Sequence, residues 1–153
     1  MGNTYSQLYI HIVFAVKNRN ALLSDAWAER VRLYISATVQ NNGHKMLCIN
    51  HMPDHVHMFV GLNPSQSLSD LMRLVKGDSS EWINKERLTP FKFQWQEGYG
   101  AFSYSKSQID QVVKYINNQQ EHHKKITFLE EYVKLLESFD VQFDERYIFK
   151  QPS

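Results

Sequence analysis

The chain has 153 residues, which is long enough for one domain with a hydrophobic core of ordinary size. Hydrophobic residues make up 42% and charged residues 22% of it, so the composition is that of a globular protein without a biased tract. The net charge of +1 neither supports nor excludes a nucleic-acid partner, because a local basic patch can hide in a nearly neutral total.

Cysteine content and hydropathy argue against a disulfide-stabilised secreted protein and against a membrane protein. The chain contains one cysteine, Cys48, so it cannot form an internal disulfide, and a reducing cytoplasm fits it. The first residues lack the charged start and long apolar run of a signal peptide. No apolar stretch approaches the roughly 18 residues that a membrane span needs. We therefore expect a cytoplasmic protein with no membrane partner.

The first half of the chain alternates between strand and helix patterns. β-Branched and aromatic residues predict a buried strand over residues 8–16, followed by a basic loop. Ser24 or Asp25 can cap a helix that ends near Gly43. Residues 45–50 and 55–61 then predict two strands, and the Pro53-Asp54 turn between them indicates a hairpin.

The second half adds one more helix and strand and then turns helical. Ser67 caps a helix with an apolar stripe, and short strand patterns occur at residues 93–95 and 101–105. Ser107 can open a helix over residues 108–123, and Thr127 opens a fourth helix. Residues 139–149 alternate charged and aromatic residues, which is typical of a docking tail.

This order of elements predicts an α+β fold. The sequence β-α-β-β-α-β is that of the ferredoxin-like fold, an antiparallel sheet with two helices on one face, here with C-terminal helices added. We expect a single domain over residues 1–153, in which 107–153 form the C-terminal helices and the docking tail. An apolar stripe at Phe128, Tyr132 and Leu136 exceeds what this core needs, so we expect the C-terminal helices, from Ser107 onward, to contribute to a homodimer through this exposed stripe.

Two histidines at the start of the third strand are the most informative local feature. Alternate side chains of a strand share a face, so His55 and His57 project together while Val56 and Met58 point into the core. Two imidazoles on one rigid face can clamp a divalent metal, although the same spacing fits two surface histidines. Neutral imidazole suits Zn, Mn or Fe, and an added oxygen ligand favours Mg or Mn. His11 faces the same side or is a hydrogen-bonded structural histidine.

A second pattern falls in the helix predicted over residues 108–123. Tyr115 and Gln119 are four residues apart, so they share one helix face, and His122 follows three residues later. Tyr115 taken alone also fits a tyrosine at the border of the core, and Gln119 a solvated helix residue. His122 and His123 also fit a pair that stabilises the C-terminal end of a helix dipole.

Four segments occur together in one order and carry a resemblance. The chain resembles the single-tyrosine HUH transposases of the smallest bacterial insertion sequences, transposase A type, and the related REP-associated tyrosine transposases. The segments are His51-Met-Pro-Asp-His55-Val-His57, Lys76-Gly-Asp-Ser-Ser80, Trp95-Gln-Glu-Gly-Tyr-Gly-Ala-Phe-Ser103 and Val113-Lys-Tyr115-Ile-Asn-Asn-Gln119-Gln-Glu-His-His123. The resemblance implies that Tyr115 is the nucleophile, that His55 and His57 bind the metal, and that Gln119 completes the metal site.

The resemblance also implies an activity and partners. Such a bacterial enzyme cuts and rejoins single-stranded DNA through a phosphotyrosine intermediate, recognises hairpins near the ends of its element, and acts as a homodimer. A phenol is a weak nucleophile at its free pKa of about 10, so the reaction needs a divalent metal, Mg or Mn, and precise positioning. The alternative is a non-catalytic protein on the same fold that binds single-stranded nucleic acid.

Basic and aromatic residues could supply a DNA path. The simplest interpretation is that these residues lie on the solvated surface. Alternatively, they could together contact DNA phosphates, with Trp95 stacking on a base. The candidates are Lys17, Arg19, Arg73, Lys76, Trp95 and Lys106.

Overall fold

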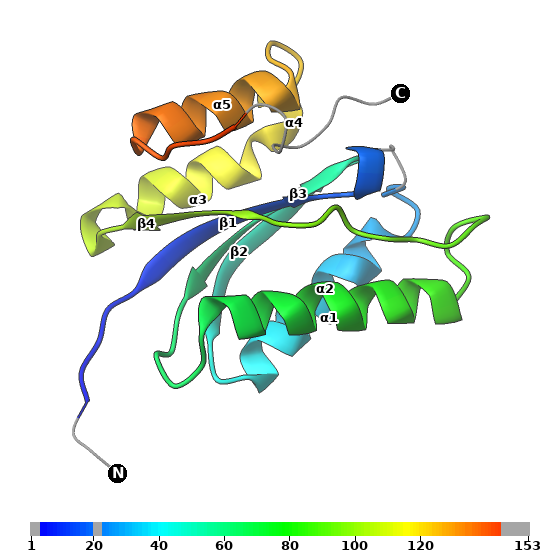
Figure 1. Cartoon of the computed structure of the whole chain (residues 1–153), viewed down its shortest axis with the longest axis horizontal. Helices are drawn as coiled ribbons and strands as arrows, with labels where there is room; N and C mark the ends of the chain where they lie inside the picture. Colours follow the sequence, from blue (N-terminus) through cyan, green and yellow to red (C-terminus); the bar gives the residue numbers. More distant parts are fainter. Residues whose placement is uncertain (1–3, 20–22, 145–153) are drawn as a thin grey trace.

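The computed structural model describes residues 4–19 and 23–144 (Figure 1). Its elements follow the expected order except that the strand predicted at residues 93–95 is not formed, since only an isolated bridge joins Val16 and Trp95 there. The strands are β1 (Tyr9–Ala15), β2 (Lys45–Met52), β3 (His55–Gly61) and β4 (Gly100–Tyr104). The helices are α1 (Ala28–Asn41), α2 (Leu68–Lys85), α3 (Ile109–Asn117), α4 (Gln119–His122) and α5 (Phe128–Ser138). Short 3-10 turns occur at η1 (Lys17–Arg19) and η2 (Lys106–Gln108). None of the helices in these residues is long and apolar enough to cross a bilayer.

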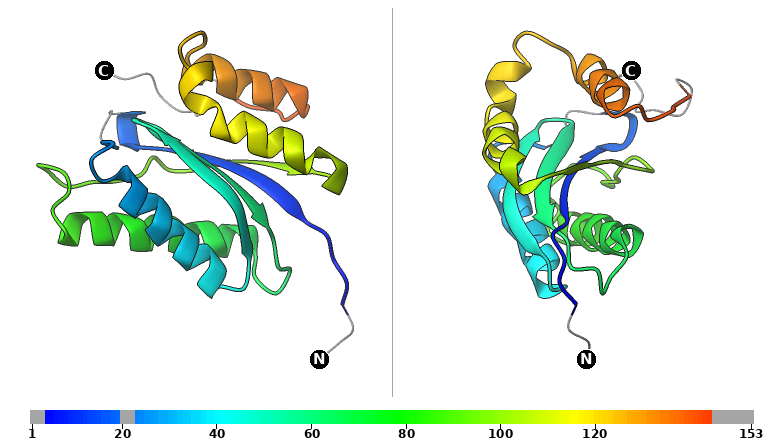
Figure 2. Two further views of the ribbon diagram at one scale, coloured as in Figure 1. Left: turned by 180° about the vertical axis from the view of Figure 1, so that it is seen from behind. Right: turned by 90° about the vertical axis from the view of Figure 1, so that its left-hand side faces the viewer.

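The four strands form one sheet in the order β2-β3-β1-β4, and every neighbouring pair is antiparallel. This is the ferredoxin-like order, so the predicted α+β fold class is confirmed. Helices α1 and α2 cover one face of the sheet, and α3, α4 and α5 lie over the other (Figures 1 and 2). The site residues of β3 therefore lie between the sheet and the C-terminal helices.

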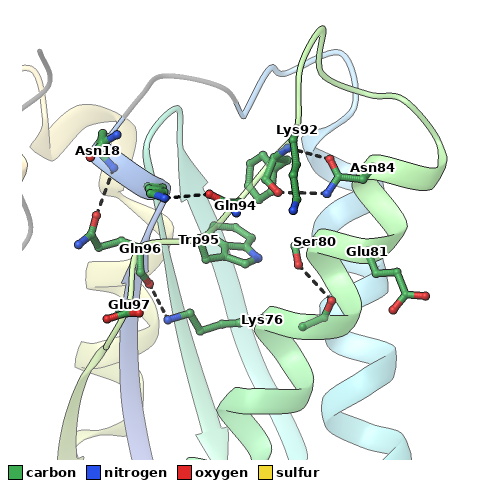
Figure 3. Close-up of a pocket in the computed structure, with 13 residues that line it drawn as sticks. Asn18, Lys76, Ser80, Glu81, Asn84, Lys92, Gln94, Trp95, Gln96 and Glu97 are labelled. Carbon is green, nitrogen blue, oxygen red and sulfur yellow. Dashed lines mark hydrogen bonds between the residues drawn. The ribbon is translucent and has the colours of Figure 1, made fainter.

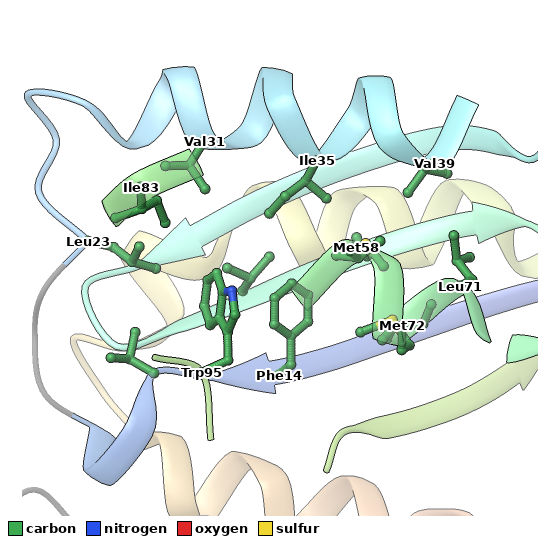
Figure 4. Packing of buried hydrophobic residues seen from close by; sticks show 14 of the residues in the cluster. Phe14, Leu23, Val31, Ile35, Val39, Met58, Leu71, Met72, Ile83 and Trp95 are labelled. Atoms are coloured by element: carbon green, nitrogen blue, oxygen red, sulfur yellow. The ribbon is translucent and has the colours of Figure 1, made fainter. Parts of the chain in front are cut away.

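The main core fills the space between the sheet and the first two helices (Figure 4). Side chains of β1 and β3 alternate across the sheet, so Phe14, Val56 and Met58 enter this core. They meet Ile35 of α1 and Val75 of α2, both fully buried. The strand pattern therefore leaves the other residues of β3, including His55 and His57, facing the C-terminal helices.

Of the two caps expected for the C-terminal helices, Thr127 is confirmed and Ser107 is wrong, because Ser107 lies inside η2, whose N-cap is Ser105, and α3 begins without a side-chain cap. One predicted helix is also divided. Thr127 accepts a hydrogen bond from the Glu130 backbone N–H and opens α5. The helix predicted over residues 108–123 is interrupted at Asn118, whose φ of −97° and ψ of 16° leave the helical range. Tyr115 thus belongs to α3 and Gln119 to α4.

The apolar stripe of α5 covers the second face of the sheet. Phe128, Tyr132 and Leu136 are buried against Val13 of β1 and Phe102 of β4. The stripe is buried within the chain, because α5 packs its apolar side chains against the second apolar face of the sheet. The expectation that this stripe is free to pair two copies is therefore wrong. The docking-tail prediction for 139–149 falls partly on residues 145–149, which lie outside the described residues.

Candidate active site

His55 and His57 project from β3 on the same face, as the strand spacing predicts. Their ring centroids are 5.1 Å apart, and both side chains are completely buried. His57 Nδ1 shares a hydrogen bond of 2.8 Å with Nε2 of His11, which stands on the neighbouring strand β1. This contact orients the His57 ring so that its Nε2 faces the C-terminal helices.

His55 is held by the residue before it. Its Nδ1 lies 2.8 Å from Asp54 Oδ1, and its Nε2 is buried with no hydrogen-bond partner among the described residues. Burial lowers the pKa of His55 to about 4 even though Asp54 opposes the shift, so the ring is neutral near pH 7. A neutral imidazole with one nitrogen anchored and the other unpaired is typical of a metal ligand.

A carboxylate from α5 enters the same space. Glu131 is only 2% exposed, and its Oε1 lies 3.2 Å from His57 Nε2 and 3.0 Å from His123 Nε2. The unpaired Nε2 of His55 is 3.8 Å from the same oxygen. Burial alone would raise the pKa of Glu131, but the hydrogen bonds from His123 and His57 outweigh burial and hold that pKa well below its usual range.

The second oxygen of Glu131 contacts the expected nucleophile. Oε2 accepts hydrogen bonds from the Tyr115 hydroxyl and, at 2.9 Å, from Gln119 Nε2. Burial and the charge of Glu131 raise the pKa of Tyr115 far above its ordinary value, so its hydroxyl stays protonated in this arrangement. Tyr115 and His122 also line a surface hollow of about 680 Å³, which gives access from solvent.

The residues present can hold a divalent cation. Donor atoms of His55, His57, His123 and Glu131 all lie within 4.8 Å of one another, close to the span of ligands around one metal ion. Gln119 is fully buried and its Oε1 has no hydrogen-bond partner among the described residues, so it can add an oxygen donor. The buried, unpartnered atoms of His55 and Gln119 are the observation that fits a metal.

Two members of this cluster were missed from the sequence. His123 fitted a helix-dipole role, and Glu131 was not singled out at all. A signal for Glu131 was present: it stands three residues after Phe128 and directly before Tyr132, on the apolar face of α5. A glutamate on a buried helix face needs a partner or a cation.

The predicted DNA-contacting residues divide into two groups. Lys17, Lys76 and Trp95 line one groove of about 770 Å³, together with Lys92 (Figure 3). Lys76 reaches across it to donate to the backbone oxygens of Gln96 and Gly98, at 2.6 and 2.9 Å.

The remaining candidates lie elsewhere. Arg73 and Lys106 are exposed but do not line the groove. The side chain of Arg19 falls outside the described part of the structure.

Trp95 does not offer its ring to a base. It is 8% exposed, packs edge-on against Phe14 and Phe93, and donates its indole N–H to Ser79. The expected stacking is therefore corrected: Trp95 belongs to the core and forms the floor of the groove.

The groove and the histidine pair lie at the same end of the sheet. Ala15 of β1 is the strand partner of His55, and Lys17 follows it by two residues. A second hollow, of about 420 Å³, opens beside His55 and His123 and is lined by Lys124 and Lys125. Two lysines, Lys124 and Lys125, thus lie beside the histidine cluster.

Comparisons with known proteins agree with this geometry. The profile of the family described as "Transposase IS200 like" matches residues 4–119. The chain is 28% identical over 119 residues to the ISDra2 transposase TnpA of Deinococcus radiodurans, covering 74% of this chain and 84% of that protein. The matched range includes His55, His57, Tyr115 and Gln119, and it ends before His123 and Glu131.

Two solved structures share the fold. The crystal structure of a candidate transposase from Deinococcus radiodurans aligns with a TM-score of 0.62 at 24% identity, over 78% of this chain and 95% of that one. A REP-associated tyrosine transposase bound to a REP hairpin aligns with a TM-score of 0.62 at 15% identity, over 94% of this chain and 91% of that one. At these identities the likeness concerns the fold.

Proposed function

Because the chain belongs to the IS200-like transposase family, we propose that it cuts and rejoins single-stranded DNA through a covalent phosphotyrosine on Tyr115. One observation carries the proposal: the hydroxyl of Tyr115 and the imidazoles of His55 and His57 converge on the same carboxylate, Glu131. A nucleophile beside a cluster of metal-ligating groups is the arrangement that phosphoryl transfer requires.

In the proposed reaction the histidines and Gln119 bind the metal, and Tyr115 is the nucleophile. His55 and His57, with the unpaired Oε1 of Gln119, would hold a divalent cation. When bound, that cation supplies stabilisation of the charge that develops on the scissile phosphate. Tyr115 oxygen loses its proton and attacks phosphorus in line with the 3′-oxygen; the bond between phosphorus and the 3′-oxygen breaks, and that oxygen leaves as a 3′-hydroxyl after taking up a proton, so one proton is released and one is consumed. The new tyrosine–phosphate bond keeps the energy of the phosphodiester, so a 3′-hydroxyl of another strand can reverse the step without ATP.

Single-stranded DNA with hairpins is the proposed substrate. The likeness to a structure that contains a REP hairpin supports this substrate class. The groove of Lys17, Lys76 and Lys92 supports a phosphate path that leads toward the histidine end of the sheet. The homodimer stays a prediction from the family resemblance.

Adduct formation tests the proposed function. The wild-type chain, incubated with a single-stranded hairpin that carries its cleavage site and with Mn²⁺ or Mg²⁺, should form a protein–DNA adduct that resists denaturant. Tyr115→Phe removes only the hydroxyl and should abolish the adduct while hairpin binding survives. Tyr5→Phe is the matched control, since Tyr5 is 90% exposed. Hairpin binding without any adduct in the wild-type chain would instead support the non-catalytic alternative.

A further inference from the structure

We propose that Glu131 is a ligand of the metal site and also the residue that positions the nucleophile beside it. The proposal rests on the proposed function for the role of Tyr115, but its metal-binding part stands alone. The match to the transposase family ends at residue 119, so this role falls to a part of the chain that the shared profile does not include.

The first argument is the burial of the Glu131 carboxylate among imidazole groups. A carboxylate that is 2% exposed needs hydrogen-bond donors or a positive partner, because an unpaired ion is strongly disfavoured away from water. All its ion-pair partners within the described residues are histidines: His55, His57, His122 and His123. A divalent cation among these side chains would add a positive charge and engage the buried, unpartnered Nε2 of His55.

The second argument is the division of the carboxylate between two sets of partners. Oε1 faces the imidazoles of His57 and His123 at 3.2 and 3.0 Å. Oε2 accepts the hydroxyl of Tyr115 and the amide of Gln119. One buried side chain therefore connects the metal donors to the phenol, and it would hold the reacting oxygen beside a bound cation.

The third argument is the support that surrounds Glu131. His123 Nδ1 lies 2.9 Å from the backbone oxygen of Ile126, which turns its Nε2 toward Glu131. The ring of Phe128 stacks on His55 with centroids 3.8 Å apart and planes 9° from parallel. A second layer that fixes ring orientation is what ordered metal sites use. Helix α5 is therefore part of the active site and not only a cover for the sheet.

The donor set also selects the metal. Three imidazole nitrogens and one carboxylate suit Mn²⁺, Fe²⁺ or Zn²⁺ better than Mg²⁺, which prefers oxygen donors. We therefore expect Mn²⁺ to bind more tightly than Mg²⁺. Equal affinity for the two ions would contradict the imidazole-rich site.

Metal titration without DNA tests the inference. Mn²⁺ affinity of the full chain is measured by calorimetry for wild type, Glu131→Gln and Glu131→Asp. Glu137→Gln is the matched control, because Glu137 is an exposed glutamate on the same helix. We expect Glu131→Gln to lower the affinity by about tenfold or more. Glu131→Asp keeps the carboxylate on a side chain one methylene shorter, so its Mn²⁺ affinity should lie between those of wild type and Glu131→Gln. The Mn²⁺ affinity of Glu137→Gln should equal that of wild type.

The outcomes separate this inference from the proposed function. A folded Glu131→Gln chain, checked by circular dichroism, that binds Mn²⁺ like wild type overturns the inference, as does a wild-type chain that binds no metal. Should Glu131→Gln fail to fold, Glu131→Asp decides by the same comparison. If Glu131 controls Mn²⁺ affinity but no adduct forms on any hairpin, the metal role stands and the proposed function fails. If the adduct forms equally fast without the Glu131 carboxylate, the positioning role is wrong while the proposed function stands.

Discussion

The docking of α5 on the sheet can be tested through one aromatic side chain, Phe128. The ring is 3% exposed, and it lies parallel to the His55 ring at 3.8 Å and within 5.9 Å of the Tyr132 ring. Phe128→Ala removes this contact and leaves a cavity at the point where α5 begins. Since α5 carries Glu131, the change should loosen the active site together with the helix.

The magnitude follows from the burial. Replacing a fully buried phenylalanine by alanine costs about 3–5 kcal/mol, which is a large part of the 5–15 kcal/mol that stabilises an ordinary domain. For a chain of this length each kcal/mol lowers the melting temperature by about 2–4 °C, so we expect a loss of roughly 6–20 °C. Leu33→Ala is the control, because Leu33 is 65% exposed on α1 and should change stability by about 0.5 kcal/mol or less.

Thermal unfolding and hydrogen exchange measure the effect. Phe128→Ala should melt well below wild type, and the amides of α5 should exchange faster while those of β1 and β3 stay protected. A melting temperature equal to that of Leu33→Ala, with unchanged exchange in α5, would refute the reasoning. The helix would then be held by contacts other than those of Phe128.

Three further predictions concern the sheet, the histidine site and the groove. Gly100→Ala should destabilise the chain by about 1–3 kcal/mol, because a Cβ there would lie 2.7 Å from the buried Tyr132 ring, whereas Gly77→Ala in open space on α2 should stabilise it by about 0.5–1 kcal/mol. Urea denaturation checks this pair, and the same sign for both variants would contradict it. The metal-free chain should lose about 3 kcal/mol of unfolding free energy as the pH falls from 6.5 to 4, because unfolded His55 binds a proton that the folded site, with its pKa of about 4, excludes. This contribution is complete above pH 6.5, so a flat stability profile from pH 8 to 4 would show that His55 is not buried and neutral. Lys92→Ala should weaken binding to any hairpin sequence and reduce the slope of log affinity against log salt by about 0.7–0.9, as measured by fluorescence anisotropy. An unchanged slope would place the phosphates outside this groove.

Much of the candidate site follows from local patterns in the sequence. The period of two along β3 separates His55 and His57 from the core residues between them, and that separation is confirmed. Helix spacing placed Tyr115 and Gln119 on one face. They still meet at Glu131 although Asn118 interrupts the helix between them. Strand spacing of this kind is a property of the backbone, so the separation of faces along β3 does not depend on what the sheet packs against.

The sequence by itself determined the order of strands and helices, the two-faced pattern of β3 and the capping residues that begin α2 and α5. Only the tertiary structure decided that α5 folds back on the sheet of its own chain, so that its apolar stripe is covered without a second copy. The same packing brings Glu131 to histidines that lie far from it along the chain. An apolar stripe predicts that one face of a helix is buried, but it does not identify the surface against which that face packs. That choice depends on the summed packing of the whole chain, which no local window contains.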